Sequence, residues 1–117
     1  MNLLLLAIAG ALGTVCRYEI SKLLSWQQLP VATLIVNVLG SLMLGFLFAK
    51  YATHQQNIFT ILGVGFCGGF TTFSTFSLDL FKMIQNQQYV DMFLYLALSV
   101  ILGIAGIMAG VYLSKIV

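Results

Sequence analysis

The chain has 117 residues, of which 61% are hydrophobic and only 7% are charged. So few polar residues cannot cover an apolar core with a water-compatible surface, which excludes an ordinary soluble globular protein and indicates a lipid environment. The net charge of +2 is too small for the basic surface of a nucleic-acid-binding protein, so we expect no nucleic-acid partner. Because one membrane crossing takes about 20 apolar residues, the length predicts a single domain, 1–117, with at most four spans.

Polar or helix-stopping residues interrupt the apolar pattern in three places, at residues 25–30, 53–57 and 85–89. The segments between them predict four transmembrane helices, at residues 3–24, 31–51, 58–83 and 92–114. Each segment is about 21 to 26 residues long and measures about 31 to 39 Å as a helix, enough to cross a bilayer with some tilt. The expected fold class is therefore an all-α, multi-pass membrane protein.

The first predicted span carries Thr14 and Arg17, which are three residues apart and lie on one side of a helix. Arg17 is the one cation deep inside a predicted span. Glu19 is the only acid in this segment, and it is bracketed by Arg17 and Lys22. We therefore expect Glu19 to be a paired acid near the end of the span.

The second predicted span places Thr33, Asn37 and Ser41 four residues apart, and the fourth places Tyr95 and Ser99 four apart. Each set occupies one stripe of its helix. A polar side chain in lipid costs free energy unless it meets a partner or lines a wet path. Singly, Asn37 or Ser99 is better explained by an interhelical hydrogen bond. Together, the stripes predict a shared polar track.

The third predicted span is unlike a plain membrane helix. Residues 65–77 read Gly-Phe-Cys-Gly-Gly-Phe-Thr-Thr-Phe-Ser-Thr-Phe-Ser, with glycines followed by five hydroxyl residues interleaved with aromatic rings. Paired glycines raise backbone freedom and hydroxyls offer competing hydrogen-bond partners, so the pattern predicts a break near bilayer mid-depth. The alternative is close helix packing through small residues.

The polar groups available to the track favour an anion over a cation. The acids Asp79 and Asp91 lie near the ends of their segments, whereas a cation path usually needs buried carboxylates or carbonyl rings. The track offers amide hydrogens, hydroxyl hydrogens and Arg17 instead. Phe73 and Phe76 add ring edges, which are electropositive. Considered alone, two phenylalanines indicate core residues; three residues apart beside the predicted break, they become candidates for a pore lining.

The flanking charges do not select an orientation. With four spans, Lys50 and Lys115 flank one side of the membrane and Lys22 and Lys82 the other, with Arg17 deeper in the first span. The positive-inside rule therefore gives almost no instruction. A chain without this bias can insert either way up, which predicts dual topology and an antiparallel homodimer. The alternative is one orientation set by another factor.

Three motifs resemble the Fluc, or CrcB-like, family of fluoride channels: Gly-Thr-Val-Cys-Arg at 13–17, Asn-Val-Leu-Gly-Ser at 37–41, and the stretch 65–77. The resemblance covers essentially the whole chain. It implies a dual-topology antiparallel homodimer in the bacterial plasma (inner) membrane. Two parallel pores would conduct fluoride passively down its electrochemical gradient, which exports a toxic anion and confers fluoride resistance. It implies no enzymatic activity.

The resemblance also assigns roles to residues. Phe73 and Phe76 are implied to be the pore phenylalanines whose ring edges face fluoride, with Asn37 as the amide donor beside them. A hydroxyl-bearing pore wall is implied for Thr33, Tyr95 and Ser99. Arg17 is implied to be the vestibule cation.

The backbone carbonyls of Gly68 and Thr71 are implied to hold a central structural Na⁺. Two carbonyls from each of two chains give 2 × 2 = 4 oxygens, a hard ligand set suited to an alkali cation. Asp79, where the family often has Glu, and Gly103, where a hydroxyl is common, depart from the pattern.

Two other functions are considered. A small multidrug or guanidinium exporter is also a four-span dual-topology dimer, but its chemistry needs a carboxylate deep in the first span, where this chain has only Glu19. A structural or accessory membrane subunit would explain the apolar composition and the glycines. It would not explain the aligned amide, hydroxyl and phenylalanine track.

Overall fold

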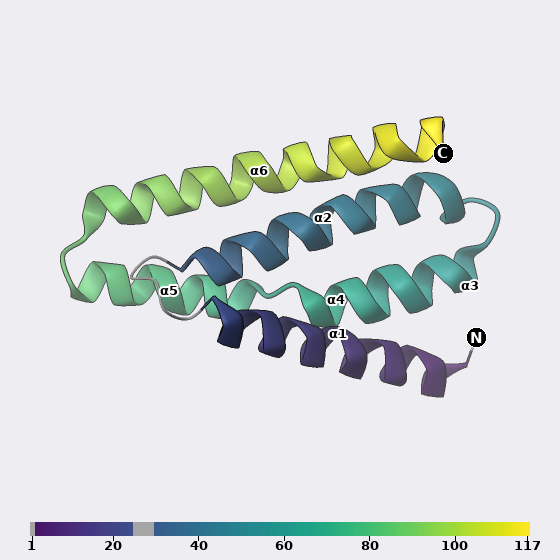
Figure 1. The fold of residues 1–117 in the computed structure, drawn as a ribbon, viewed down its shortest axis with the longest axis horizontal. Coiled ribbons are helices and arrows are strands. Elements are labelled where there is room, and N and C mark those ends of the chain that lie inside the picture. Colours follow the sequence, from purple (N-terminus) through teal and green to yellow (C-terminus); the bar gives the residue numbers. More distant parts are fainter. Residues whose placement is uncertain (1, 25–29) are drawn as a thin grey trace.

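The computed structural model describes residues 2–24 and 30–117, and the regular structure of this part is helical (Figure 1). In chain order the elements are α1 (Leu3–Leu23), α2 (Val31–Tyr51), α3 (Gln56–Phe59), the π-helix η1 (Thr60–Cys67), α4 (Gly68–Phe70), α5 (Phe73–Gln85) and α6 (Tyr89–Ile116). The elements from α3 to α5 form one span, so the described residues contain four helices long and apolar enough to cross a membrane. The chain is a multi-pass membrane protein.

The predicted span limits agree with the structure to within three residues at each end. The second span, 31–51, matches at both ends, and Pro30 directly precedes it, a favourable place for a residue without a backbone N–H. At the start of α1, the Asn2 side chain accepts a hydrogen bond from the Leu4 N–H at 2.9 Å. Apart from Pro30, the first predicted loop lies outside the described residues.

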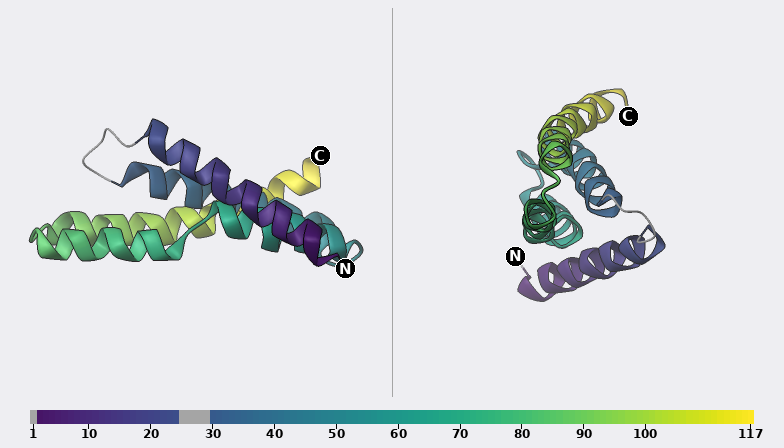
Figure 2. Two further views of the ribbon diagram at one scale, coloured as in Figure 1. Left: turned by 90° about the horizontal axis from the view of Figure 1, so that it is seen from below. Right: turned by 90° about the vertical axis from the view of Figure 1, so that its left-hand side faces the viewer.

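The four spans run side by side along the long axis of the molecule (Figure 1). Both termini and the α2–α3 connection lie at one end, and the α5–α6 connection lies at the other, as four crossings require. The molecule is flat, with extents of 48 × 30 × 20 Å. Figure 2 shows α1 running obliquely across the other helices.

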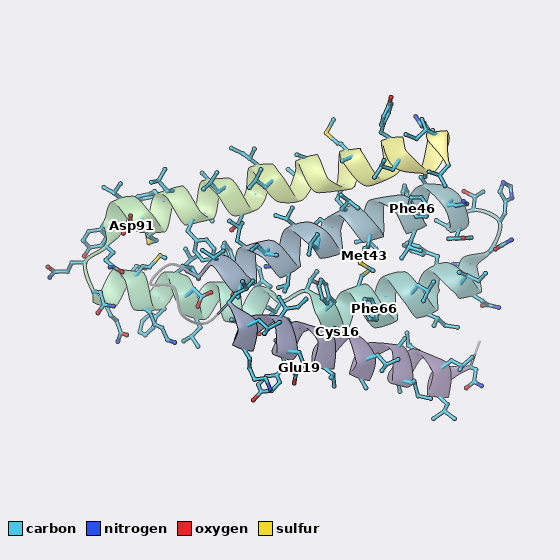
Figure 3. All side chains as sticks on the ribbon, in the orientation of Figure 1. Cys16, Glu19, Met43, Phe46, Phe66 and Asp91 are labelled. Atoms are coloured by element: carbon cyan, nitrogen blue, oxygen red, sulfur yellow. The ribbon has the colours of Figure 1, made fainter. Side chains whose placement is uncertain are left out.

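Glycines allow α2 and α6 to pack along their length. A Cβ on Gly110 of α6 would overlap Leu42 O of α2, and a Cβ on Gly45 of α2 would overlap Ile107 O of α6. Backbones approach this closely in membranes only where side chains are small. Most large apolar side chains point outward, as lipid contact requires. Met43 and Phe66 lie between α2 and η1, where they line an apolar pocket (Figure 3).

The third span is bent at Thr71 and Thr72, whose backbones are extended (φ/ψ −89°/161° and −152°/121°). The sequence pointed to the glycines and hydroxyl residues of 65–77 together; the bend lies in the hydroxyl part, while Gly68 and Gly69 remain helical. The threonines leave the helix because their hydrogen-bonding groups find other partners. The Thr72 Oγ1 accepts from the Thr75 N–H at 3.1 Å and so caps α5.

The bend gives the two halves of the third span different neighbours. Before it, η1 and α4 pack against α1 and α2; after it, α5 packs mainly against α6. Figure 2 shows α5 alongside α6, and the segment that joins α4 to α5 crosses over between them. The bend therefore lies where side chains of α1 and α2 reach the backbone of the third span.

Candidate functional site

Asn37 of α2 holds the backbone of Thr72 at the bend. Its Nδ2 donates to Thr72 O at 3.1 Å, and the Thr72 N–H donates to its Oδ1 at 2.8 Å. A primary amide can do both because it carries a donor and an acceptor. The backbone N–H and C=O of Thr72 are thereby both satisfied. One of the two Nδ2 hydrogens remains for another acceptor.

The carbonyl oxygens at the end of α4 lose their usual donors, since a helix ends on carbonyls with no N–H four residues further on. Gly69 O accepts from Arg17 Nε at 3.1 Å and from Thr14 Oγ1 at 3.4 Å. Within residues 2–24 and 30–117, no donor reaches the carbonyl oxygens of Gly68 or Thr71. These two carbonyls remain available to a cation.

An open pocket of about 290 Å³ lies at the bend, between α2 and the third span. Its walls come from both elements and are formed by Asn37, Gly40, Ser41, Leu44, Gly63, Cys67, Gly68, Thr71, Thr72 and Phe73. The pocket therefore joins the Asn37 amide, the Gly68 and Thr71 positions, and one of the two predicted pore phenylalanines.

The two phenylalanines stand next to each other on α5 but differ in exposure. The Phe73 side chain is 78% exposed, whereas Phe76 is 8% exposed. Their ring centroids are 5.9 Å apart. Phe76 also makes an edge-to-face contact with Tyr95 of α6, with centroids 5.0 Å apart and an interplanar angle of 65°. In one chain, Phe73 is thus largely exposed at the edge of the pocket, while Phe76 is buried in the core.

Tyr95 is the polar centre of the α2–α5–α6 contact. It is buried, and its hydroxyl donates to Asp79 Oδ2 at 3.0 Å. Thr33 of α2 is a buried polar residue as well. One turn further along α6, the Ser99 Oγ is buried and has no hydrogen-bond partner among the described residues. The Tyr95 hydrogen is therefore already engaged, whereas the Ser99 hydroxyl is not.

The family model for CrcB-like protein, Camphor Resistance, matches residues 4–111, which is most of the chain. The chain belongs to the CrcB-like family. The protein named fluoride-specific ion channel FluC of Caulobacter sp. (strain K31) is 42% identical, over 97% of this chain and 94% of its own. FluC 1 of Ligilactobacillus salivarius is 40% identical, over 94% and 96%. FluC of Coxiella burnetii (strain Dugway 5J108-111) is 40% identical, over 98% of each chain.

This CrcB-like chain brings most of the predicted site residues into two adjoining groups. Around the pocket lie Asn37, Gly68, Thr71 and Phe73. Phe76 and Tyr95 lie at the contact between α5 and α6, and the 5.9 Å contact between the two phenylalanines links the groups. Thr33 of α2 is buried. Ser99 lies beyond Tyr95 on α6. Arg17 lies outside both groups, on the α1 side of α4.

Three polar residues of the CrcB-like site were not predicted in their roles. Thr72 is the partner of Asn37, Asp79 is the partner of Tyr95, and Thr14 shares the Gly69 carbonyl with Arg17. The hydroxyl run and the Thr14–Arg17 spacing indicated polar faces. Which atoms those faces would meet depends on contacts between distant segments.

The acidic side chains of this CrcB-like chain do not form a cation site. Glu19 and Lys22 form an ion pair with 3.1 Å between Oε1 and Nζ, and both side chains are more than half exposed. In the part of the chain that the structure describes, no three His, Cys, Asp or Glu side chains come together. Backbone oxygens at the bend are therefore the candidate cation ligands.

Proposed function

We propose that this chain forms a fluoride-selective channel that exports F⁻ passively and so confers fluoride resistance. Two antiparallel copies would form a homodimer with two pores. The observation that carries the proposal is the bend of the third span, which gathers a free amide hydrogen, two phenylalanine rings and freed carbonyls. Membership of the CrcB-like family and relatives named as fluoride-specific ion channels support the same assignment.

The donors around the bend suit a small anion. Asn37 keeps one amide hydrogen after bonding to Thr72, and it lines the pocket. The buried, unpartnered Ser99 Oγ is a second group that an anion would satisfy. Thr33 and Tyr95 extend the same wall. The Tyr95 hydroxyl is already bonded to the Asp79 carboxylate. The negative charge of that carboxylate would repel an anion.

Phe73 and Phe76 would supply ring edges to the ion. An aromatic ring is electropositive at its edge, so a dehydrated anion is stabilised in the ring plane rather than above it. Phe76 is already fixed by its contact with Tyr95, whereas Phe73 is 78% exposed in a single chain. A second copy would cover Phe73, so that each pore uses Phe76 of one chain and Phe73 of the other.

The same second copy would complete a Na⁺ site. The carbonyls of Gly68 and Thr71 accept no hydrogen bond among the described residues, and nothing lies within 4 Å of a Cβ placed on Gly68. Open, unbonded carbonyls are suitable ligands for a hard alkali cation. Two from each chain give 2 × 2 = 4 oxygens on the dimer axis. Bound there, Na⁺ would fix the two bends against each other.

The balance of charges allows the antiparallel arrangement. Lys50 and Lys115 lie at one end of the spans and Lys22 and Lys82 at the other, so neither orientation is favoured. Arg17 would raise the local anion concentration at the entrance, since its guanidinium keeps further N–H groups after the bond from Nε to Gly69.

A passive pore is sufficient for export. Hydrogen fluoride enters as a neutral molecule, ionises in the near-neutral cytoplasm and is trapped there as F⁻. A negative-inside potential lowers the free energy of moving one negative charge outward by about 2.3 kcal/mol per 100 mV. The ion therefore leaves without a further energy source.

The test is fluoride efflux from proteoliposomes that contain the purified chain, with a fluoride electrode outside and the voltage clamped by K⁺ and valinomycin. We expect rapid fluoride efflux and no chloride efflux. Equal release of both ions, or no release of either, would contradict the proposal. An exporter coupled to protons would instead need a pH gradient, so efflux without one also separates the two mechanisms.

A further inference from the structure

The first span contributes two side chains to a single carbonyl of the bend. Arg17 Nε and Thr14 Oγ1 both donate to Gly69 O, at 3.1 and 3.4 Å. In a continuous helix this oxygen would accept from the Phe73 N–H, which the bend takes away. The α1 side chains therefore replace the lost bond, at a carbonyl that lies between Gly68 and Thr71 in the chain.

The backbones of α1 and α4 are also in direct contact. A Cβ on Gly69 would overlap Gly10 O, and a Cβ on Gly13 would overlap Phe66 O and lie 2.9 Å from the Phe70 N. No side chain separates the two helices at these positions. A movement of α1 is therefore transmitted to the end of α4.

We propose that Arg17, assisted by Thr14, is a positioning residue for the Na⁺ site. By holding Gly69 O, it fixes the end of α4 so that the Gly68 and Thr71 carbonyls keep the arrangement that binds the cation. This role rests on the proposed function, in which those two carbonyls bind Na⁺. It is separate from the attraction of anions by the Arg17 charge.

The hydrogen bond and the charge of Arg17 act on Na⁺ in opposite directions. The guanidinium is itself a cation near the site, so its charge weakens Na⁺ binding, while its hydrogen bond to Gly69 O strengthens it. Lysine keeps the charge but replaces the planar guanidinium with a flexible ammonium group. Arg17→Lys therefore isolates the loss of positioning, and Thr14→Val removes the neutral donor without changing any charge.

The experiment is a Na⁺ titration of the thermal unfolding of the purified dimer, with N-methylglucamine keeping the ionic strength constant. We expect Arg17→Lys to raise the half-saturating Na⁺ concentration about tenfold, as loss of a charge-assisted hydrogen bond would. Thr14→Val should raise it about two- to threefold, as loss of a long neutral hydrogen bond would. Lys22→Gln, which changes an α1 charge that pairs with Glu19, is the control and should leave the value unchanged.

An unchanged half-saturating concentration in Arg17→Lys would overturn the positioning role. If the melting of the unsubstituted chain does not respond to Na⁺, the proposed Na⁺ site is wrong. Hydrogen exchange of the backbone amides from 71 to 75 is then the second readout, and it tests whether Arg17 holds the bend. Faster exchange in Arg17→Lys than in Lys22→Gln would show that Arg17 still holds the bend. Equal exchange rates would overturn that role as well.

Discussion

The third and fourth spans are both apolar and glycine-containing, yet only the third is bent. α6 runs unbroken for 28 residues, and Gly106 and Gly110 bring it against α2. The third span turns out of helical geometry at Thr71 and Thr72, where Asn37 supplies replacement hydrogen bonds. Glycine in a membrane helix thus indicates close packing. A bend needs partners on other helices for the backbone groups that it releases.

The largest expected effect breaks the packing of the unbent span. In Gly110→Leu the new side chain would overlap the Leu42 carbonyl, which the α2 backbone cannot move away without separating the helices. We expect a loss of at least about 3 kcal/mol and no recoverable dimer. The matched control is Gly103→Leu on the same helix, where the nearest atom to a Cβ is Ser41 Oγ at 3.8 Å. Size-exclusion chromatography in detergent compares the two, and equal yields would contradict the packing described for α6.

The next largest effect is expected for a substitution that disturbs the hydrogen bonds at the bend of the third span. Asn37→Asp keeps the acceptor for the Thr72 N–H but places a carboxylate against Thr72 O and in the anion path. Repulsion between like charges about 4 Å apart should lower fluoride flux about a hundredfold or more. Asn57→Asp makes the same chemical change at an exposed position of α3 and should conduct normally. Normal flux through Asn37→Asp would exclude Asn37 as a pore donor.

Removal of Na⁺ tests the carbonyls that distinguish the bent span from α6. Replacing Na⁺ with N-methylglucamine should lower the stability of the proposed dimer, by about 2.7 kcal/mol if Na⁺ was present at a hundred times its Kd. Differential scanning fluorimetry in both salts measures the shift. N-methylglucamine at equal concentration controls for ionic strength, and K⁺ and Li⁺ test the selectivity of the site among alkali cations. Identical melting in all four salts would rule out the site.

The smallest effect concerns the contact between the two spans. Tyr95→Phe keeps the edge-to-face contact with Phe76 but leaves the Asp79 carboxylate without its donor. A freed carboxylate beside the path should reduce fluoride flux about three- to tenfold, with about 1 kcal/mol of lost stability. Tyr112→Phe, at an exposed position of the same helix, should change neither quantity. A loss of stability without a loss of fluoride flux would make Tyr95 a structural residue only.

The four spans could be predicted because lipid imposes one strong constraint, a long apolar run for each crossing. Pro30, the polar residues 53–57 and the polar residues 85–89 marked the limits to within three residues. The family resemblance implied that Asn37 lies beside Phe73, and both residues line the pocket at the bend.

The position of the bend and the partners of the polar side chains could not be predicted. The glycines and hydroxyl residues of 65–77 together predicted a break, but they do not say which residue leaves the helix. Gly69 packs directly against Gly10 of α1 and remains helical, so the chain leaves the helix two residues later, at Thr71. Arg17 lies 52 residues from Gly69, and Tyr95 lies 16 residues from Asp79. Such pairs depend on how whole helices cross. The pattern of residues within one helix does not predict that crossing.

The central claim is that the bend gathers phenylalanine edges into an anion path, and one pair of substitutions on α5 tests it most directly. Phe76 is buried beside Tyr95, whereas Phe81, on the same helix, is more than half exposed. Fluoride efflux from proteoliposomes should fall about tenfold or more in Phe76→Ile, with the dimer intact, and remain within about twofold of normal in Phe81→Ile. Equal efflux from the two variants would contradict the claim.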